Sequence, residues 1–341
     1  MHFFDEGIHM RIGTKALSVA AAATLMFSLA ACGSSDNSSD NSTNSADQGT
    51  FAQDSSTLIF GAVPDQAGSD SNWKPLEDYI AKKTGLKVVY KPTTDYAALI
   101  TAAVAGQVDV AAFSGATYVN ATNKGAKLDV VAAQITSPGL TTPGYYSDPI
   151  VATKNASKIT SVAQFAGKKV CFVDPSSTSG FLYPLLALKT AGIDVTPTGQ
   201  DANGNPTFKD FTAYFAGAHD KSVAAVASGQ CDVGFAEDTE SEASGSGVSV
   251  VGKDNPAERQ LVPGGPTVIS DALPASLKTQ LTSILGTVSP TDITNAGISV
   301  TDGFTNFFFG ELPENSSYYK PIYDACGAAD IAAAASAVCG G

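Results

Sequence analysis

Apolar positions recur along this chain at two spacings, and the spacings predict strands and helices in alternation. Short apolar runs typical of buried strands occupy residues 58–63, 87–90, 108–113, 169–173 and 231–235. Segments with helical spacing occupy residues 73–83, 96–105, 180–190 and 221–228. Alternating strands and helices predict mainly parallel sheets covered by helices on both faces. Because the alternation occurs in two sets, we expect two α/β lobes.

An internal repeat relates the two sets. Residues 106–110, Gly-Gln-Val-Asp-Val, match residues 229–233, Gly-Gln-Cys-Asp-Val, and each segment opens a buried strand after an Ala/Val-rich helix. Polar residues at matching positions are Tyr96 and His219 before the helices, and Ser114 and Glu237 after the strands. In open α/β sheets, ligands bind beyond the carboxyl ends of strands. Two related lobes therefore predict a ligand cleft lined from both sides.

The first 31 residues have the features of a secretory signal peptide. Arg11 and Lys15 precede an apolar run at 16–31, which is too short to span a membrane comfortably. The run ends in Leu-Ala-Ala-Cys-Gly, which resembles the lipobox of bacterial lipoproteins, with Cys32 as the lipidated first residue. The alternative is an ordinary signal peptide with a chance cysteine. Met10 is a more natural start than Met1.

Composition after the leader excludes several classes of partner and site. Residues 32–57 are almost entirely small and polar, and we expect a flexible tether there. Lys and Arg number 20 against 33 Asp and Glu, a net charge of −13, which argues against nucleic acid or an anionic membrane surface as the main partner. Two of the 3 His, His2 and His9, lie in the leader, which excludes a multi-histidine metal site. We expect no metal and no cofactor.

The four cysteines beyond the leader form an even set in an oxidising compartment. Cys171 and Cys231 each lie in a short apolar run, and Cys326 and Cys339 flank an Ala-rich stretch. We expect the disulfides Cys171–Cys231 and Cys326–Cys339. The alternative is four free buried thiols.

The strongest local signal is the segment 174–180, Asp-Pro-Ser-Ser-Thr-Ser-Gly, between a buried strand and an apolar helix. A helix N-terminus carries unsatisfied N–H donors and a partial positive charge, so this segment predicts an anion site. Plain helix capping is the alternative, but it needs only one Ser or Thr. No Lys or Arg stands in this loop or in residues 94–99 and 114–118. Hydrogen bonds and helix dipoles would therefore neutralise the anion.

Four segments together resemble a known family. They are Asp-Pro-Ser-Ser-Thr-Ser-Gly-Phe-Leu-Tyr-Pro at 174–184, Gly-Ala-His at 217–219, Asp-Tyr at 95–96 and Pro-Gly-Tyr at 143–145. These segments are similar to those of phosphonate/phosphite/phosphate-type substrate-binding proteins of ABC importers, and the resemblance covers residues 58–281. It implies a type II periplasmic-binding-protein fold, with the ligand between two α/β lobes. We expect one lobe from 58–147 plus 262–341 and the other from 148–261.

The resemblance also implies roles for individual residues. Ser177, Thr178 and Ser179 would hold the oxyanion, and His219 would donate from the same lobe. Tyr96 and Tyr145 would close from the other lobe and the hinge side. Asp238 best matches the family's acidic residue, with Glu237 as the alternative. A carboxylate only accepts, so it selects ligands with a P–OH or an amine. Aminoalkylphosphonate binders tend to have an acid where this chain has Gly265, which favours phosphite, phosphate or a small alkylphosphonate.

We therefore expect a non-enzymatic, lipid-anchored solute-binding protein at the extracytoplasmic face of the bacterial cell membrane. Its partners would be the phosphorus oxyanion and the permease and ATPase of an ABC importer. One alternative is a serine-type hydrolase using Ser177 or Ser179 with His219 and Asp220 or Asp238. Against it, no Gly-x-Ser-x-Gly elbow occurs. Another alternative is a ligand sensor of the same fold.

Overall fold

The computed structural model of this chain describes residues 49–64 and 66–340. The predicted signal peptide at 1–31, the lipidation site Cys32 and the larger part of the predicted tether lie outside the described residues. Within the described part, none of the helices combines the length and apolar character that crossing a membrane requires.

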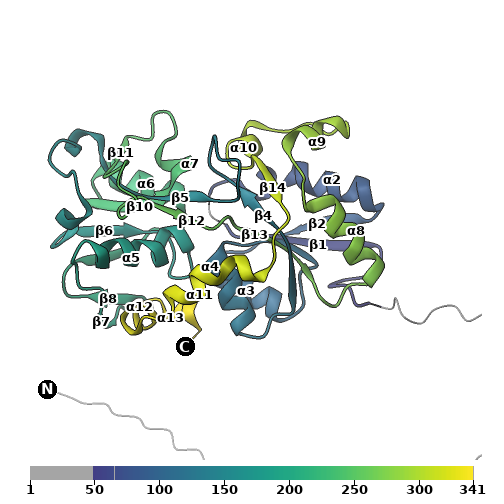
Figure 1. The fold of residues 1–341 in the computed structure, drawn as a ribbon, viewed down its shortest axis with the longest axis horizontal. Coiled ribbons are helices and arrows are strands. Elements are labelled where there is room, and N and C mark those ends of the chain that lie inside the picture. Colours follow the sequence, from purple (N-terminus) through teal and green to yellow (C-terminus); the bar gives the residue numbers. More distant parts are fainter. Residues whose placement is uncertain (1–48, 65, 341) are drawn as a thin grey trace, which may run out of the picture. The chain divides into compact units, whose positions relative to one another are not determined.

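The first lobe is built on a six-stranded sheet in the order β14-β4-β13-β3-β1-β2 (Figure 1). Its strands are β1 (Thr57–Ala62), β2 (Lys87–Lys91), β3 (Val110–Ala112), β4 (Leu128–Ile135), β13 (Pro266–Ser270) and β14 (Gly310–Leu312). The helices that pack with it are α1 (Ser69–Asn72), α2 (Lys74–Thr84), α3 (Tyr96–Val104), α4 (Gly115–Asn123), α8 (Ala275–Leu285), α9 (Pro290–Asn295) and α10 (Asp302–Thr305).

The second lobe has a sheet in the order β11-β5-β10-β6-β9, with β12 also paired to β5. Its strands are β5 (Tyr145–Ala152), β6 (Lys169–Phe172), β9 (Thr212–Phe215), β10 (Val233–Glu237), β11 (Val248–Val250) and β12 (Gln260–Val262); β7 (Pro197–Gln200) and β8 (Pro206–Phe208) form a separate hairpin. The helices are η2 (Thr153–Asn155), η3 (Val162–Phe165), the π-helix η4 (Thr178–Leu182), α5 (Tyr183–Thr190), α6 (His219–Ser228) and α7 (Asp238–Ser241).

Both sheets are mixed, so the expectation of mainly parallel sheets is wrong. The β1–β2, β1–β3, β6–β9 and β6–β10 pairs are parallel, as the strand–helix alternation predicts. The strands beside the two connections between the lobes pair antiparallel instead: β4 with β13 and β14, and β5 with β10, β11 and β12. The chain leaves the first lobe after β4 and returns through β12 and β13. These returning strands run against their neighbours.

Folded structure begins before the predicted start at residue 58. The backbone N–H of Thr50 donates to the carbonyl of Ala272 at 2.7 Å, and that of Ala52 donates to Asp109 Oδ1 at 2.8 Å. These bonds attach the last residues of the predicted tether to the first lobe, and Thr57 already belongs to β1. Polar composition concealed this attachment because backbone groups make it.

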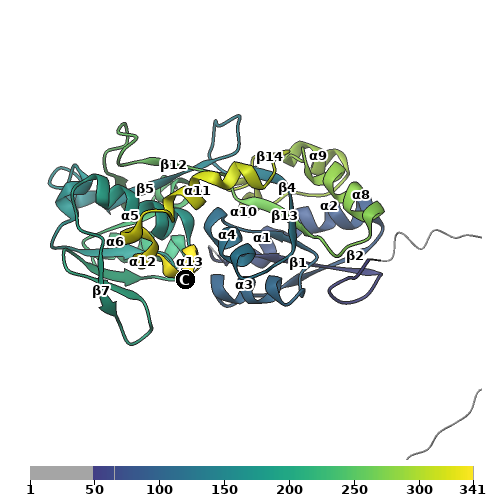
Figure 2. The same cartoon turned by 60° about the horizontal axis from the view of Figure 1, so that its bottom comes forward.

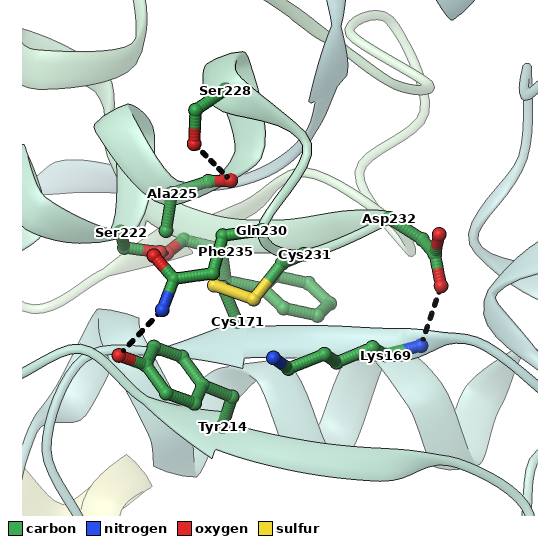
Figure 3. Close-up of a disulfide and its surroundings, with 10 residues drawn as sticks. All are labelled: Lys169, Cys171, Tyr214, Ser222, Ala225, Ser228, Gln230, Cys231, Asp232 and Phe235. Carbon is green, nitrogen blue, oxygen red and sulfur yellow. Dashed lines mark hydrogen bonds between the residues drawn. A yellow bond between two sulfur atoms is a disulfide. The ribbon is translucent and has the colours of Figure 1, made fainter.

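Both predicted disulfides are present. Cys171–Cys231 joins β6 to the segment before β10, and Figure 3 shows it beside the hydrogen bond from Gln230 Nε2 to the Tyr214 hydroxyl, 2.9 Å long. Cys326–Cys339 closes a loop near the C-terminus. Each bridge removes conformational freedom from the unfolded chain, more for the pair separated by 60 residues than for the pair separated by 13.

The C-terminal residues contact both lobes, although we expected 262–341 to lie in the first lobe. After η5 (Ser316–Tyr319), they form α11 (Lys320–Ala325), α12 (Ala329–Ala334) and α13 (Ser336–Cys339). Figure 2 shows α11 and α13 beside α4 of the first lobe and α12 near β7 of the second. Lys189 on α5 forms an ion pair of 2.7 Å with Asp330 on α12. The exact lobe boundaries stay a prediction.

Candidate ligand-binding site

The predicted anion loop lies where β6 turns into η4 and α5. Ser177 is the N-cap of η4, and its Oγ accepts the backbone N–H of Gly180 at 3.0 Å. A side chain at position 180 would place its Cβ 2.3 Å from Val173 Cβ, so the close approach of loop and strand requires glycine there. The loop is thus held tightly against the carboxyl end of β6.

Ser179 has an open hydrogen-bonding group inside the protein. Its side chain is fully buried, and its Oγ has no hydrogen-bond partner among the described residues. Its carbonyl accepts from Ser147 Oγ at 2.7 Å. A buried hydroxyl without a partner costs free energy, so Ser179 Oγ is a candidate to meet a ligand.

The two lobes touch at this loop through the N-terminus of α4. Ser114 caps α4, and the N–H of Ala116 in the first turn of α4 donates to Thr178 Oγ1 at 2.8 Å. In addition, Thr117 Oγ1 donates to the Ser176 carbonyl at 3.1 Å. Two helix N-termini, one from each lobe, therefore converge here. Thr178, predicted to hold the ligand, accepts a bond from the opposite lobe and keeps its own proton for donation.

His219, the first residue of α6, is a neutral donor. Its Nδ1 accepts the backbone N–H of Glu237 at 2.9 Å, which places the imidazole proton on Nε2. Burial lowers the pKa of His219 to about 3, so the ring carries no charge at neutral pH. Because Nδ1 is occupied and Nε2 is protonated, the ring cannot accept a proton from a serine, as a hydrolase triad requires.

A small cavity of about 30 Å³ lies between the lobes at this end of the sheets. Its polar lining comes from Ser114, Gln134, Thr136, Tyr145 and Glu237. The described residues that line it include no Lys or Arg. This volume holds a water molecule or two. An oxyanion therefore requires the lobes to move apart.

Of the side chains predicted for the ligand, Tyr145 and the alternative acid Glu237 line this cavity, and Ser177, Thr178, Ser179 and His219 are not among its lining residues. Tyr145, at the start of β5, lines it directly. Glu237 also lines it and connects it to His219 through the bond described above. Ser147 pairs in register with Glu237 and bonds to Ser179, so the anion loop lies at the same end of the sheet. Tyr96 begins α3 and is buried with the hydrophobic core.

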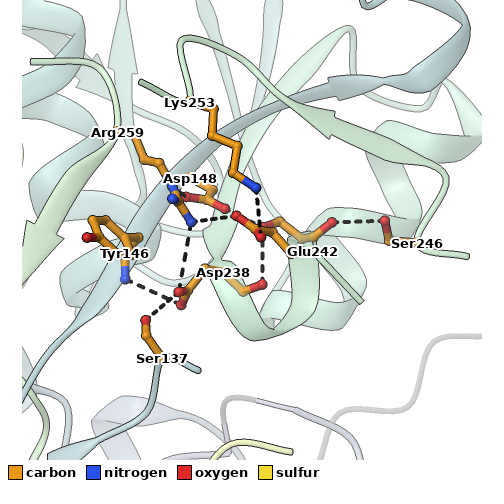
Figure 4. A network of polar contacts seen from close by, with 9 residues as sticks. Ser137, Tyr146, Asp148, Asp238, Glu242, Ser246, Lys253 and Arg259 are labelled. Atoms are coloured by element: carbon orange, nitrogen blue, oxygen red, sulfur yellow. Dashed lines mark hydrogen bonds and ion pairs between the residues drawn. The ribbon is translucent and has the colours of Figure 1, made fainter. Parts of the chain in front are cut away.

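Glu237, rather than the expected Asp238, lines the cavity. The Asp238 carboxylate accepts from Ser137 Oγ and from the Tyr146 N–H at 3.3 Å, and lies 3.9 Å from Arg259 Nη2 (Figure 4). Burial raises the pKa of Asp238 to about 6. Both Asp238 oxygens therefore have protein partners, and Asp238 is not among the residues that line this cavity.

Arg259 is the centre of this second polar cluster. Its Nε donates to Asp148 Oδ1 at 2.6 Å and its Nη2 to Glu242 Oε1 at 2.5 Å. Ser241 Oγ donates to the other Asp148 oxygen, also at 2.5 Å. We call Ser137, Asp148, Asp238, Ser241, Glu242 and Arg259 the Arg259 network. The network is not evident from the sequence, although a charged residue such as Asp148 within an apolar strand indicates a buried partner.

Gly265, where the resemblance places an acid in aminoalkylphosphonate binders, also lines the cavity. A Cβ on Gly265 would lie 2.5 Å from the Phe113 carbonyl oxygen. Backbone packing therefore excludes an acidic side chain here unless the strands move.

The internal repeat has a structural counterpart. Tyr96 and His219 are the first residues of α3 and α6, and Ser114 and Glu237 are the N-caps of α4 and α7. The repeated aspartates also match: Asp109 Oδ2 accepts from Ile59 N–H at 2.8 Å, and Asp232 Oδ2 from Lys169 N–H at 2.9 Å. Each lobe therefore presents equivalent positions at the same end of its sheet.

Comparison with solved structures defines the class. The Prochlorococcus marinus PhnD1 structure in complex with methylphosphonate has a TM-score of 0.63 at 20% identity, covering 80% of this chain and 97% of that one. A binding-protein component of a Pseudomonas aeruginosa ABC phosphonate transporter has a TM-score of 0.61 at 21% identity, covering 80% and 86%. The fold is the two-lobed α/β fold of type II periplasmic binding proteins.

Sequence comparison identifies the family. The profile described as "ABC transporter, phosphonate, periplasmic substrate-binding protein" matches residues 60–307, and the chain belongs to this family. The phosphate-import protein PhnD of Mycolicibacterium smegmatis is 41% identical over 185 residues, 54% of this chain and 56% of the relative. The probable phosphite-binding protein PhnD1 of Prochlorococcus marinus is 27% identical over 184 residues, 52% and 57%. The chain spans about half the length of the curated relatives it matches. The family consists of binding proteins, not enzymes, and the hydrolase alternative has no support.

Proposed function

We propose that this chain binds a phosphorus oxyanion between its lobes and delivers it to the permease and ATPase of an ABC importer. The observation that carries the proposal is the buried Oγ of Ser179, which has no hydrogen-bond partner in the described part of the chain and lies at a helix N-terminus that faces the N-terminus of α4. Converging helix N-termini supply N–H donors and partial positive charge without any cationic side chain. Relatives described as importing phosphate and binding phosphite or methylphosphonate support this ligand class.

We assign the donors as follows. Ser177, Thr178 and Ser179 hold the oxyanion with hydroxyl and backbone N–H groups, and His219 donates from Nε2. When the ligand enters, Thr178 exchanges its bond to Ala116 for one to the ligand, and the two N–H-rich termini close on it from opposite lobes. Tyr96 and Tyr145 complete the enclosure. This is a hinge closure around the ligand.

Glu237 takes the role first considered for Asp238. It lines the cavity, while Asp238 is held by the Arg259 network. An ionised carboxylate accepts and cannot donate, so it favours a ligand with a P–OH group and disfavours sulfate. The close packing at Gly265 leaves no room for the acid that would pair with a ligand amine. Phosphite, phosphate or a small alkylphosphonate therefore fits better than an aminoalkylphosphonate.

Lipidation at Cys32 would hold the protein at the extracytoplasmic face of the cell membrane, with the following polar segment as a tether. Labelling with a radioactive fatty acid in the native host tests this part of the proposal. Label on the wild-type chain and none on Cys32→Ser is the expected result. Equal labelling of both chains would contradict it.

Isothermal titration of the full chain in detergent tests the ligand class. We expect tight binding of at least one of phosphate, phosphite and methylphosphonate, weaker binding of 2-aminoethylphosphonate, and no binding of sulfate. The protein must first be stripped of bound ligand by partial unfolding and refolding. If the folded protein binds none of the phosphorus ligands, the proposal is overturned.

A further inference from the structure

A row of buried polar side chains leads away from the cavity into the first lobe. Gln134 on β4 lines the cavity, and its Nε2 donates to Thr267 Oγ1 on β13 at 3.3 Å. Thr267 Oγ1 in turn donates to Glu311 Oε1 on β14 at 2.5 Å. All three side chains are at least 95% buried. Only one end of the row, the Gln134 amide, reaches the cavity.

The hydrogen bonds in this row fix which way the Gln134 amide points. A threonine hydroxyl has one proton, and when Glu311 is ionised, Thr267 gives that proton to it. Toward Gln134, Thr267 can therefore only accept, so it takes the amide NH₂ and leaves the amide oxygen on the other side. There, Gln134 Oε1 lies 3.4 Å from where a Cβ of Gly265 would be, and Gly265 lines the cavity.

We propose that Gln134 is a specificity-determining residue whose Oε1 accepts the proton of a P–OH group, and that Thr267 and Glu311 position it. This inference rests on the proposed function and deepens it, because it names protonated phosphorus oxyanions as the ligand class. Glu237 from the second lobe and Gln134 from the first then present acceptors to the same cavity. An oxyanion that carries no proton faces two acceptors and can donate to neither of them.

A positioning role for Glu311 accounts for the presence of a buried carboxyl group, which is costly for the fold. Glu311 is 2% exposed, and its Oε2 has no hydrogen-bond partner among the described residues. Burial raises the pKa of Glu311 to about 8, so the carboxylate that accepts the Thr267 proton prevails above that pH. A valine or leucine at 311 would avoid this cost. It would also release the Thr267 proton, which could then turn to Gln134 and reverse the amide.

The test compares phosphate with monofluorophosphate, a tetrahedral analogue in which fluorine replaces the P–OH. Titrations use the full chain in detergent at pH 9, where Glu311 is mostly ionised. We expect the wild type to bind phosphate about tenfold or more tightly than monofluorophosphate, as one hydrogen bond to a charged ligand implies. In Thr267→Val and Gln134→Met, this preference should fall to about twofold. Thr57→Val, a buried threonine of β1 away from the cavity, is the matched control and should keep it.

The ratio of the two affinities separates recognition from structural damage, because a loosened fold weakens both ligands alike. Equal losses for the two ligands, or an unchanged ratio in both variants, would overturn the inference. A wild type that does not bind phosphate would also overturn it. The proposed function fails only if the wild type also binds neither phosphite nor methylphosphonate, so the two failures are distinguishable.

Discussion

Two buried polar clusters of the second lobe, the anion loop with His219 and the Arg259 network, differ in how completely their atoms are paired. In the network, Arg259 bonds to Asp148 and Glu242, and Ser241 takes the remaining Asp148 oxygen. In the loop, Ser179 Oγ has no hydrogen-bond partner among the described residues. The loop therefore retains hydrogen-bonding capacity for a ligand, and the network has used its own on the fold.

The contrast shows why residue type alone does not identify a binding site. Glu237 and Asp238 are adjacent carboxylates, both at least 91% buried. One lines the cavity and the other is bonded to Ser137 and to the backbone of Tyr146. The two neighbouring carboxylates therefore lie in different surroundings, Glu237 at the cavity and Asp238 within the Arg259 network.

The largest expected effect comes from breaking the network at Arg259. Arg259→Met keeps much of the apolar volume beside Tyr146 but leaves Asp148 buried without a cation. Removing one partner of a buried ion pair costs about 3–5 kcal/mol of unfolding free energy. Urea unfolding measures it.

Lys278→Met is the matched control for Arg259. Lys278 also pairs with two acids, Asp129 and Asp271, but near the surface, where such pairs contribute about 0–1 kcal/mol. A similar small loss in both variants would show that the network contributes little to stability.

The next largest effect is a loss of ligand affinity without a loss of stability. Ser179→Ala removes a hydroxyl that has no hydrogen-bond partner within the described fold, so the unfolding free energy should stay the same or rise slightly. Affinity for the phosphorus ligand should fall about 10- to 100-fold, as expected for one hydrogen bond to a charged group. Titration and urea unfolding on the same preparation give both values.

Ser222→Ala is the control for Ser179. Ser222 is equally buried in the same lobe, but its Oγ donates to the Phe235 carbonyl at 2.8 Å. This variant should lose about 1 kcal/mol of stability and no affinity. If the two variants behave alike, then pairing within the fold is not what distinguishes the loop from the rest of the lobe.

The sequence predicted the features that depend on neighbouring residues. The helix expected from residue 96 does begin at Tyr96, and Gly85, the expected stop of the helix before it, is the C-cap of α2 in the left-handed conformation. The segment 174–180 could be singled out because its hydroxyls and the helix that follows are contiguous in the sequence. Both disulfides followed from the placement of the cysteines in buried runs and around a short loop.

Features that depend on distant residues were not predictable from one sequence. The direction of β4 and β5 follows from where the chain crosses between lobes, which local spacing does not encode. Arg259 lies 111 residues from its partner Asp148, so nothing near Asp148 pointed to it. The choice between Glu237 and Asp238 depended on that same network. Gln134 was missed because its partners lie on two strands from the end of the chain.

The smallest expected effect is a pH dependence of stability that belongs to the network. Burial raises the pKa of Asp238 from 3.8 to about 6, with the nearby Asp148 charge adding to it. Between pH 4 and 6, folded Asp238 therefore binds a proton that the unfolded chain has released. Acidification from pH 7 to 4 stabilises the wild type relative to Asp238→Asn, by about 1–2 kcal/mol.

Urea unfolding of both proteins at pH 4, 5, 6 and 7 measures this difference. The control is Asp324→Asn, which replaces an exposed aspartate of α11. Its unfolding free energy should change with pH as that of the wild type does. A constant gap between wild type and Asp238→Asn across this range would mean that Asp238 titrates alike in the folded and unfolded chains. The network would then not hold it as a buried carboxylate, and its separation from the cavity-lining Glu237 would lose its physical basis.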